Sequence, residues 1–108
     1  MIQAAFDQND AGQITGFLLT GHAEYADPGS DIVCAAVSVL VINCINSIDT
    51  LTGVSFLQEA DEESGRILFR LQDAPSAETE LLLQSLLLGL QSLEEQYDDY
   101  LDLIIREV

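Results

Sequence analysis

The segment Ile32–Ser47 constrains the fold more than any other part of this 108-residue chain. It contains neither proline nor glycine, and Asp31 just before it is a good helix N-cap. Its alanines favour a helix and its β-branched residues suit a strand equally well, but the segment is too long for an ordinary strand. A helix is therefore predicted. Because this helix is apolar on nearly every side, we expect a sheet and also a second subunit to cover it.

The residues before this helix predict a hairpin followed by a loop. Apolar and other residues alternate over 2–6 and again over 13–19, which is typical of strands, and turn formers fill 7–12. Two glycines and a proline then follow within 21–30, so this segment is predicted to be a mobile loop.

The second half of the chain repeats the pattern of two strands and a helix. The segments 54–59 and 66–72 predict a strand pair around the turn 61–65. A second helix with a stripe of leucines is predicted from Ser76 to about Tyr97. The apolar residues 103–105 are expected to form a short last strand.

The element order ββαββα predicts an α+β fold. We expect two layers, in which an antiparallel sheet packs against two helices and a short strand ends the chain. Residues 1–108 are expected to form a single domain with a modest core, which a partner subunit would help to complete.

The charge of the chain is strongly unbalanced. Nineteen acidic residues face three arginines, no lysine is present, and the formal net charge is −16. Such a surface repels nucleic acid and anionic lipid, and it attracts basic partners. The acidity also has a simpler explanation, because it keeps a small apolar domain soluble. Charge alone leaves both explanations open.

The apolar segments indicate where the protein resides. The N-terminus lacks the basic region and the long apolar run of a signal peptide. The longest apolar stretches, 32–42 and 81–90, fall short of the ~20 residues that span a bilayer. A cytoplasmic protein without membrane contact is therefore predicted.

Two cysteines, Cys34 and Cys44, lie on the predicted first helix. Ten residues of helix separate them by about 15 Å, far beyond the ~7 Å Cα limit of a disulfide, so no intrachain bridge is expected. Cys44 lies mid-helix among apolar residues, and we interpret it as part of the core. One histidine and two separated cysteines do not make a metal site, and no metal or other cofactor is predicted.

Cys34 and His22 are the residues that could carry chemistry. With Asp31 as the N-cap, Cys34 is the third helical residue, where the helix dipole and unpaired backbone N–H groups stabilise a thiolate. His22, the only histidine, lies twelve positions earlier in the predicted loop. Cysteine with histidine is the minimal pair for covalent acyl transfer, and backbone N–H groups at the helix start are candidate oxyanion donors.

Each of these residues also has an ordinary structural explanation. A free cysteine is most often a buried structural thiol, and a histidine on a loop is usually solvated surface. Ser38, one turn after Cys34, either hydrogen-bonds near the thiol or bonds back to the carbonyl of Cys34. Spacing alone therefore leaves both catalysis and a structural role open.

The residues around this pair resemble those of a known family. The run GHA at 21–23, a short glycine-containing loop, and the run DIVCAAVS at 31–38 are similar to the motifs of the ribosomal-processing cysteine protease family. The resemblance extends over the whole chain. It implies that His22 and Cys34 are catalytic and that Asp31 and Ser38 support them. It also implies a substrate loop, and we assign to that loop the residues Gly21, Tyr25 and Gly29.

The resemblance further implies a substrate and an assembly. It suggests a cytoplasmic, homodimeric cysteine endopeptidase that removes the N-terminal extension of a bacterial large-subunit ribosomal protein, number twenty-seven. Such a substrate is strongly basic, so the acidic chain would attract it, and no direct contact with nucleic acid is expected. The alternative is a non-catalytic acidic binding module for a basic ribosomal protein, in which Cys34 is structural. The alkylation rate of Cys34 distinguishes the two.

Overall fold

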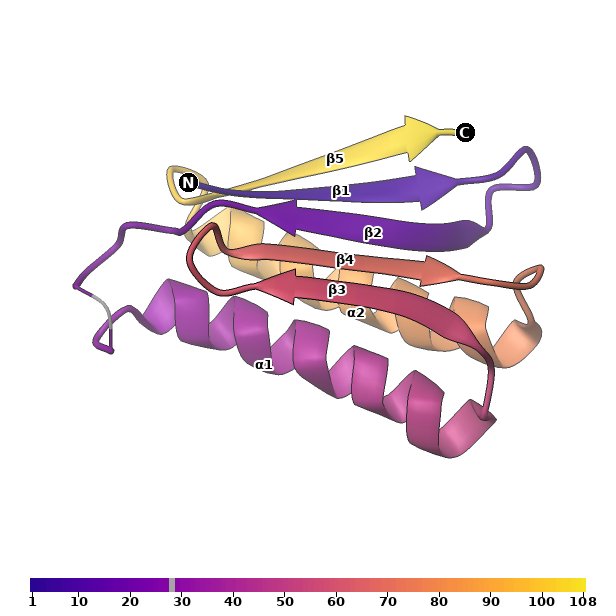
Figure 1. Cartoon of the computed structure of the whole chain (residues 1–108). Helices are drawn as coiled ribbons and strands as arrows, with labels where there is room; N and C mark the ends of the chain where they lie inside the picture. Colours follow the sequence, from indigo (N-terminus) through magenta and orange to yellow (C-terminus); the bar gives the residue numbers. More distant parts are fainter. Residues whose placement is uncertain (28) are drawn as a thin grey trace.

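The structure, a computed structural model that describes residues 1–27 and 29–108, is a five-stranded sheet with both helices on one face (Figure 1). The strands are β1 (Ile2–Gln8), β2 (Ile14–Thr20), β3 (Phe56–Asp61), β4 (Arg66–Leu71) and β5 (Leu101–Glu107). The helices are α1 (Ile32–Ser47), its π-helical continuation η1 (Ile48–Thr52), and α2 (Ala77–Gln96). The predicted α+β class and element order are confirmed, as is the C-terminal strand, which is longer than expected.

The sheet has the strand order β3-β4-β2-β1-β5. β1 pairs antiparallel with β2, β2 with β4 and β4 with β3, whereas β5 runs parallel to β1. The sheet is therefore mixed, and the predicted antiparallel pairing holds among β1 to β4 only. After β4, the chain crosses over through α2 and enters β5 in the same direction as β4. Because β1 also runs in that direction, β5 pairs with β1 in parallel.

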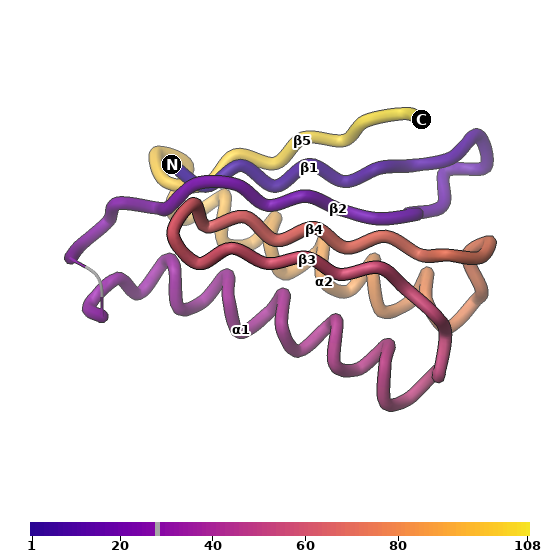
Figure 2. The backbone as a smooth tube through the Cα atoms, viewed as in Figure 1, coloured from indigo at the N-terminus to yellow at the C-terminus, as the bar shows by residue number. Residues whose placement is uncertain are grey.

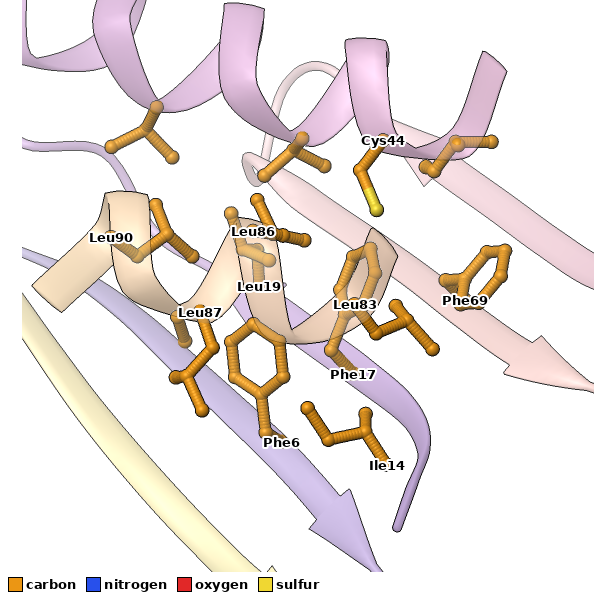
Figure 3. Packing of buried hydrophobic residues seen from close by; sticks show 14 of the residues in the cluster. Phe6, Ile14, Phe17, Leu19, Cys44, Phe69, Leu83, Leu86, Leu87 and Leu90 are labelled. Atoms are coloured by element: carbon orange, nitrogen blue, oxygen red, sulfur yellow. The ribbon is translucent and has the colours of Figure 1, made fainter. Parts of the chain in front are cut away.

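One face of the sheet meets both helices in an apolar core (Figure 3). Alternate strand residues point to this face, and the register places Ala4 opposite Leu19 and Phe6 opposite Phe17. The ring of Phe17 stacks on Phe69 at a centroid distance of 5.1 Å. Leucines of α2 close the core from the other side. This packing fixes α1 against the sheet and so positions its first turn.

The helix that begins at Ile32 does not end at Ser47 but continues through η1 to Thr52. These 21 residues are long and apolar enough to cross a membrane by length and composition, so the prediction that no segment reaches that length is wrong. In the most apolar window of this stretch, 33% of the residues are buried. Val37 and Val41 face the core, as expected for a helix that packs against a sheet.

Several connections meet at one end of the sheet. Figure 2 shows the loop from β2 to α1, the β3–β4 turn and the connection from α2 to β5 at the end where the chain begins. A hydrogen bond from the N–H of Gly21 to the carbonyl of Ser64, 3.0 Å long, joins the loop to the β3–β4 turn. Within the predicted loop 21–30, Pro28 lies outside the described residues. Both candidate catalytic residues lie at this end.

Candidate active site

Asp31 caps α1 and thereby sets the position of Cys34. Its Oδ1 atom accepts hydrogen bonds from the N–H groups of Val33 and Cys34, each at 3.0 Å. This is the N-cap predicted from the sequence. Cys34 therefore lies in the first helical turn, where the helix dipole favours a negative charge.

The second carboxylate oxygen of Asp31 holds the loop. Oδ2 accepts hydrogen bonds from the N–H groups of Tyr25, at 3.0 Å, and Ala26, at 3.4 Å. Asp31 is only 9% exposed. Burial raises the pKa of its carboxyl, but hydrogen bonds from four backbone N–H groups outweigh burial and leave this pKa below its ordinary value. One carboxylate thus joins the loop to the start of α1.

The thiol of Cys34 is half-buried and contacts the loop directly. The N–H of Ala23 donates a hydrogen bond to Cys34 Sγ, with a nitrogen–sulfur distance of 3.3 Å. Such a donor favours a thiolate, because it directs a partial positive charge at the sulfur. Ala23 follows His22 in the chain, so this contact also holds the segment that carries the candidate base near the thiol.

His22 is exposed, and the β3–β4 turn holds its ring. The imidazole Nε2 lies 2.7 Å from the carbonyl oxygen of Glu63. Within the described part of the chain, no hydrogen bond joins the imidazole to Cys34. Both side chains nevertheless line the same cleft.

This cleft has a volume of about 420 Å³ and lies between α1 and the β3 edge of the sheet. Its other lining residues come from α1, from the sheet, from the start of the β2–α1 loop and from the β3–β4 turn: Ile2, Leu19, Gly21, Val37, Ser38, Ile42, Ile45, Gln58, Ala60, Asp61, Glu62, Gly65, Arg66 and Ile67. Most of these side chains are apolar, and two of the three charged ones are acidic. The cleft therefore suits a peptide that presents apolar side chains and carries positive charge nearby.

Of the other predicted site residues, Ser38 and Gly21 line the cleft and Gly29 does not. The hydroxyl of Ser38 is exposed and makes no hydrogen bond with the described residues, so neither of its expected contacts is formed. Gly21 has a φ of 84°, and a side chain there would collide with the carbonyl of Met1. Gly29 has a φ of 88° in open surroundings.

Tyr25, predicted to belong to the substrate loop, is not among the residues that line the cleft. Its ring meets those of Tyr97 and Tyr100 edge-on, at centroid distances of 5.7 and 5.0 Å. These are all the tyrosines of the chain. Tyr25 therefore anchors the loop on the connection between α2 and β5.

The β3–β4 turn contributes more to the site than its sequence suggests. Residues 61–65 have the composition of an acidic solvated turn, yet the carbonyl of Glu63 contacts His22, which lies 41 residues away in the chain. Gly65, with a φ of 66°, leaves no room for a side chain beside the carbonyl of Gly21. A glycine in a turn is the only local signal of this contact, and it names no partner.

Three backbone N–H groups at the start of α1 already have acceptors. The N–H groups of Val33 and Cys34 donate to the side chain of Asp31, and that of Ala35 donates to its carbonyl at 3.1 Å. The N-cap and the first helical hydrogen bond occupy these three groups, so we do not assign an oxyanion to them. The exposed hydroxyl of Ser38 remains as a donor on α1 within the cleft.

Cys44 lies on the same helix in opposite surroundings. It is 6% exposed, and its Sγ lies 3.6 Å from the carbonyl oxygen of Leu82. Burial raises the pKa of this thiol to about 11. Both cysteines are free thiols, and the interpretation of Cys44 as core is confirmed. Over residues 1–27 and 29–108, no group of three or more His, Cys, Asp or Glu side chains is placed to hold a metal ion.

A half-buried thiol at a helix start, with a histidine in the same cleft, is the arrangement that a cysteine-dependent hydrolase requires. Comparison with known proteins narrows this class. The family model described as cysteine protease Prp matches residues 1–102. The ribosomal processing cysteine protease Prp of Staphylococcus aureus is 34% identical over 99 residues, which cover 92% of this chain and 93% of that protein. Its Bacillus subtilis counterpart is 31% identical over 105 residues, which cover 94% of each.

Solved structures agree with the sequence comparison. The crystal structure of S. aureus Prp with a covalently linked product peptide has a TM-score of 0.94 at 33% identity, covering 98% of this chain and 100% of that one. The structure of the same protein with a substrate peptide has a TM-score of 0.88 at 32% identity, with the same coverage. The present chain belongs to the Prp family and is a cysteine protease.

Proposed function

We propose that this chain is an endopeptidase that removes the N-terminal extension of a bacterial large-subunit ribosomal protein, number twenty-seven. Its relatives from S. aureus and B. subtilis are named ribosomal processing proteases, and one of them has been crystallised with a covalently linked product peptide. In this chain, the observation that carries the proposal is the hydrogen bond from Ala23 to Cys34 Sγ in the cleft that His22 also lines. This contact prepares the thiol to attack a peptide carbonyl.

Acylation begins when the thiol proton of Cys34 passes to the imidazole of His22. The S–H bond breaks, an N–H bond forms, and the thiolate attacks the carbonyl carbon of the scissile bond. We assign the stabilisation of the resulting oxyanion to the Ser38 hydroxyl, one turn after Cys34. The imidazolium then gives its proton to the leaving amine as the C–N bond breaks, which leaves a thioester on Cys34.

Deacylation uses water. The neutral His22 takes a proton from the water as the water oxygen bonds to the thioester carbonyl carbon. The C–S bond then breaks, and the imidazolium returns this proton to the departing sulfur, which releases the acid and restores the Cys34 thiol and the neutral His22. Asp31 supports both steps without contact to substrate, because it joins the loop that carries His22 to the helix that carries Cys34. We expect neither step to need a cofactor.

The acidity of the chain suits a basic substrate. Its formal net charge is −16, and Asp61 and Glu62 line the cleft. A ribosomal protein is strongly basic, so attraction between the two should speed their encounter, and salt should screen it. We expect kcat/KM to fall as the salt concentration rises. A kcat/KM that is independent of salt would contradict this part of the proposal.

We further propose a cytoplasmic homodimer without nucleic-acid or membrane partners. In the first helix and its continuation η1, Ile32 is 54% exposed, Val39 is 67% exposed and Leu51 is 74% exposed. A helix with apolar residues on all sides is usually covered on more than one face, and a second copy of the chain would supply that cover. Sedimentation should give twice the mass of the 11.8 kDa chain, and a monomer at micromolar concentration would contradict the dimer.

The central test incubates the extended ribosomal protein with wild type and three variants, and follows cleavage by mass spectrometry. Wild type and the control Cys44→Ala should release the extension, whereas Cys34→Ala should release none. His22→Ala should be slower by about 10²–10⁴-fold, the usual contribution of a general base. Cleavage by Cys34→Ala at the wild-type rate would contradict the nucleophile and favour the non-catalytic binding module.

A further inference from the structure

The contact between His22 and Glu63 identifies which imidazole nitrogen carries a proton. The Nε2 atom lies 2.7 Å from the backbone carbonyl oxygen of Glu63, a hydrogen-bond distance. A carbonyl oxygen can only accept, so Nε2 must be the donor. In the neutral ring, Nδ1 is then without a proton and is able to accept one.

The backbone of the β3–β4 turn builds this contact. The N–H of Gly21 donates to the carbonyl of Ser64 at 3.0 Å, so the residue before His22 is bonded to the residue after Glu63. Within the turn, the N–H of Glu63 donates to Oδ1 of Asp61 at 3.1 Å. Two adjacent contacts, Gly21 with Ser64 and His22 with Glu63, therefore hold the histidine segment against the turn.

Gly65 is the residue that permits this close approach. A Cβ atom at position 65 would collide with the carbonyl oxygen of Gly21 and lie 3.2 Å from Cε1 of His22. Its φ of 66° adds the strain of a left-handed conformation to any substitution. Gly53 offers a matched control, because its φ is 67° and a Cβ atom at position 53 would meet no neighbouring atom within 4 Å.

We propose that the backbone carbonyl of Glu63 orients His22 and selects its tautomer, with Gly65 as the positioning residue that makes room for this contact. The hydrogen bond keeps the proton on Nε2, so Nδ1 is the nitrogen that takes the thiol proton of Cys34. In that step the S–H bond breaks and an Nδ1–H bond forms. The ring then carries protons on both nitrogens, and the Glu63 carbonyl stabilises the positive charge. This inference rests on the proposed role of His22 as the base.

The tautomer can be observed directly, because His22 is the only histidine in the chain. Nitrogen NMR of the full chain labelled with ¹⁵N-histidine, at a pH where the ring is neutral, should show a protonated Nε2 and a bare Nδ1. The Nε2 proton should also exchange slowly with water, since it is held by the carbonyl. A proton on Nδ1, or a rapidly exchanging mixture like that of free histidine, would overturn the inference.

Two glycine variants separate orientation from backbone strain. Gly65→Ala should convert the single tautomer into a mixture and lower kcat about tenfold or more, with little change in KM, since a misplaced base slows the chemical step. Gly53→Ala introduces the same strain in open space and should keep both the wild-type tautomer and the wild-type kcat. Equal kcat values for the two variants would overturn the positioning role of Gly65. If Gly65→Ala does not fold, the wild-type spectrum still decides the tautomer.

Different results would overturn the role of His22 as the base and the role of the Glu63 carbonyl in orienting it. A His22→Ala protein with full activity would overturn the role of His22 as the base, and with it the proposed mechanism. If His22→Ala is inactive but the neutral imidazole of the wild-type protein carries its proton on Nδ1, only the role of the Glu63 carbonyl is overturned.

Discussion

Cys34 and Cys44 lie on one helix, yet their surroundings differ in every respect that governs thiol chemistry. Cys34 is half-buried in the first turn, accepts an N–H from Ala23 and lines a cleft. Cys44 lies about three turns later, is 6% exposed, and has the carbonyl oxygen of Leu82 beside its sulfur. An N–H group attracts a thiolate and a carbonyl oxygen repels one. The reactivity of a thiol on this helix therefore depends on its position along the helix and on whether the facing segment presents an N–H group or a carbonyl oxygen.

Alkylation should show the largest difference between the two thiols. At neutral pH, iodoacetamide should modify Cys34 at least about a hundredfold faster than Cys44, because the reaction needs an accessible thiolate. Burial denies access to Cys44 and raises its pKa to about 11. Intact-mass measurements should show one rapid label on wild type and on Cys44→Ala, and none on native Cys34→Ala. Equal alkylation rates at Cys34 and Cys44 would contradict the proposed difference in reactivity between the two thiols.

Substitution of Cys44 should lower the stability of the fold more than substitution of Cys34, the opposite of their order in reactivity. Cys44→Ser places a hydroxyl in the apolar core and should lower the free energy of unfolding by about 1–3 kcal/mol. Cys34→Ser changes a half-buried site at the edge of the cleft and should cost less than about 0.5 kcal/mol. Urea unfolding followed by circular dichroism measures both. A larger loss at Cys34 would mean that its thiol is a packing element.

Removing the Asp31 side chain should lower the reactivity of the Cys34 thiol. Asp31→Ala removes the N-cap and should lower the free energy of unfolding by about 1–2 kcal/mol. Loss of the bonds to Tyr25 and Ala26 should also loosen the loop, so alkylation of Cys34 and cleavage should both slow. Asp31→Asn keeps one acceptor oxygen and should retain part of the cap. If Asp31→Ala were alkylated at the wild-type rate, the loop contact would not matter to the thiol.

The charge of Asp31 adds a pH dependence with a defined sign. Because the pKa of its carboxyl is lower in the folded chain than its ordinary value, the carboxylate stabilises the fold above that ordinary value. This contribution should be lost as the pH falls through the lowered pKa. The stability difference between wild type and Asp31→Asn should therefore be larger at pH 7 than in acid. A difference that does not change with pH would contradict the lowered pKa.

The difference between the two cysteines was visible in outline from the sequence. An N-cap and helical spacing are local properties, so Asp31 alone placed Cys34 in the first turn and Cys44 in the middle of the helix. The contacts that complete the site are not local. Ala23 reaches the thiol, and the Glu63 carbonyl reaches the imidazole, only after the sheet has brought the loop and the β3–β4 turn together.

The fold shows the same division between local and long-range information. Strand and helix segments followed from alternation and length, whereas the parallel pairing of β5 with β1 depends on the crossover through α2. The helix also continues past Ser47 to Thr52, and of this extension only Ile48 is buried in the core, whereas Leu51 is 74% exposed. The ring of Tyr25 meets those of Tyr97 and Tyr100 edge-on, and no pattern within the loop could indicate contacts so distant in sequence.

A change of pH alone tests whether the Cys44 thiol is buried in its neutral form. Its pKa is raised from 9.0 to about 11 in the folded chain, so unfolding should release its proton at alkaline pH. The stabilising contribution of the neutral thiol is then complete below pH 9 and falls as the pH rises toward 11. The change should be at most about 1.4 kcal/mol per pH unit, the limit for one proton.

A comparison of wild type with Cys44→Ala isolates this single group. Both proteins carry the same tyrosines and arginines, so the other alkaline titrations cancel in the difference between their unfolding free energies. The advantage of wild type over Cys44→Ala should be constant from pH 7 to 9 and should shrink above pH 9. A constant difference up to pH 11 would mean that Cys44 ionises as readily in the folded chain as in the unfolded one. The contrast with Cys34 would then rest on access to the thiol and not on burial of its charge.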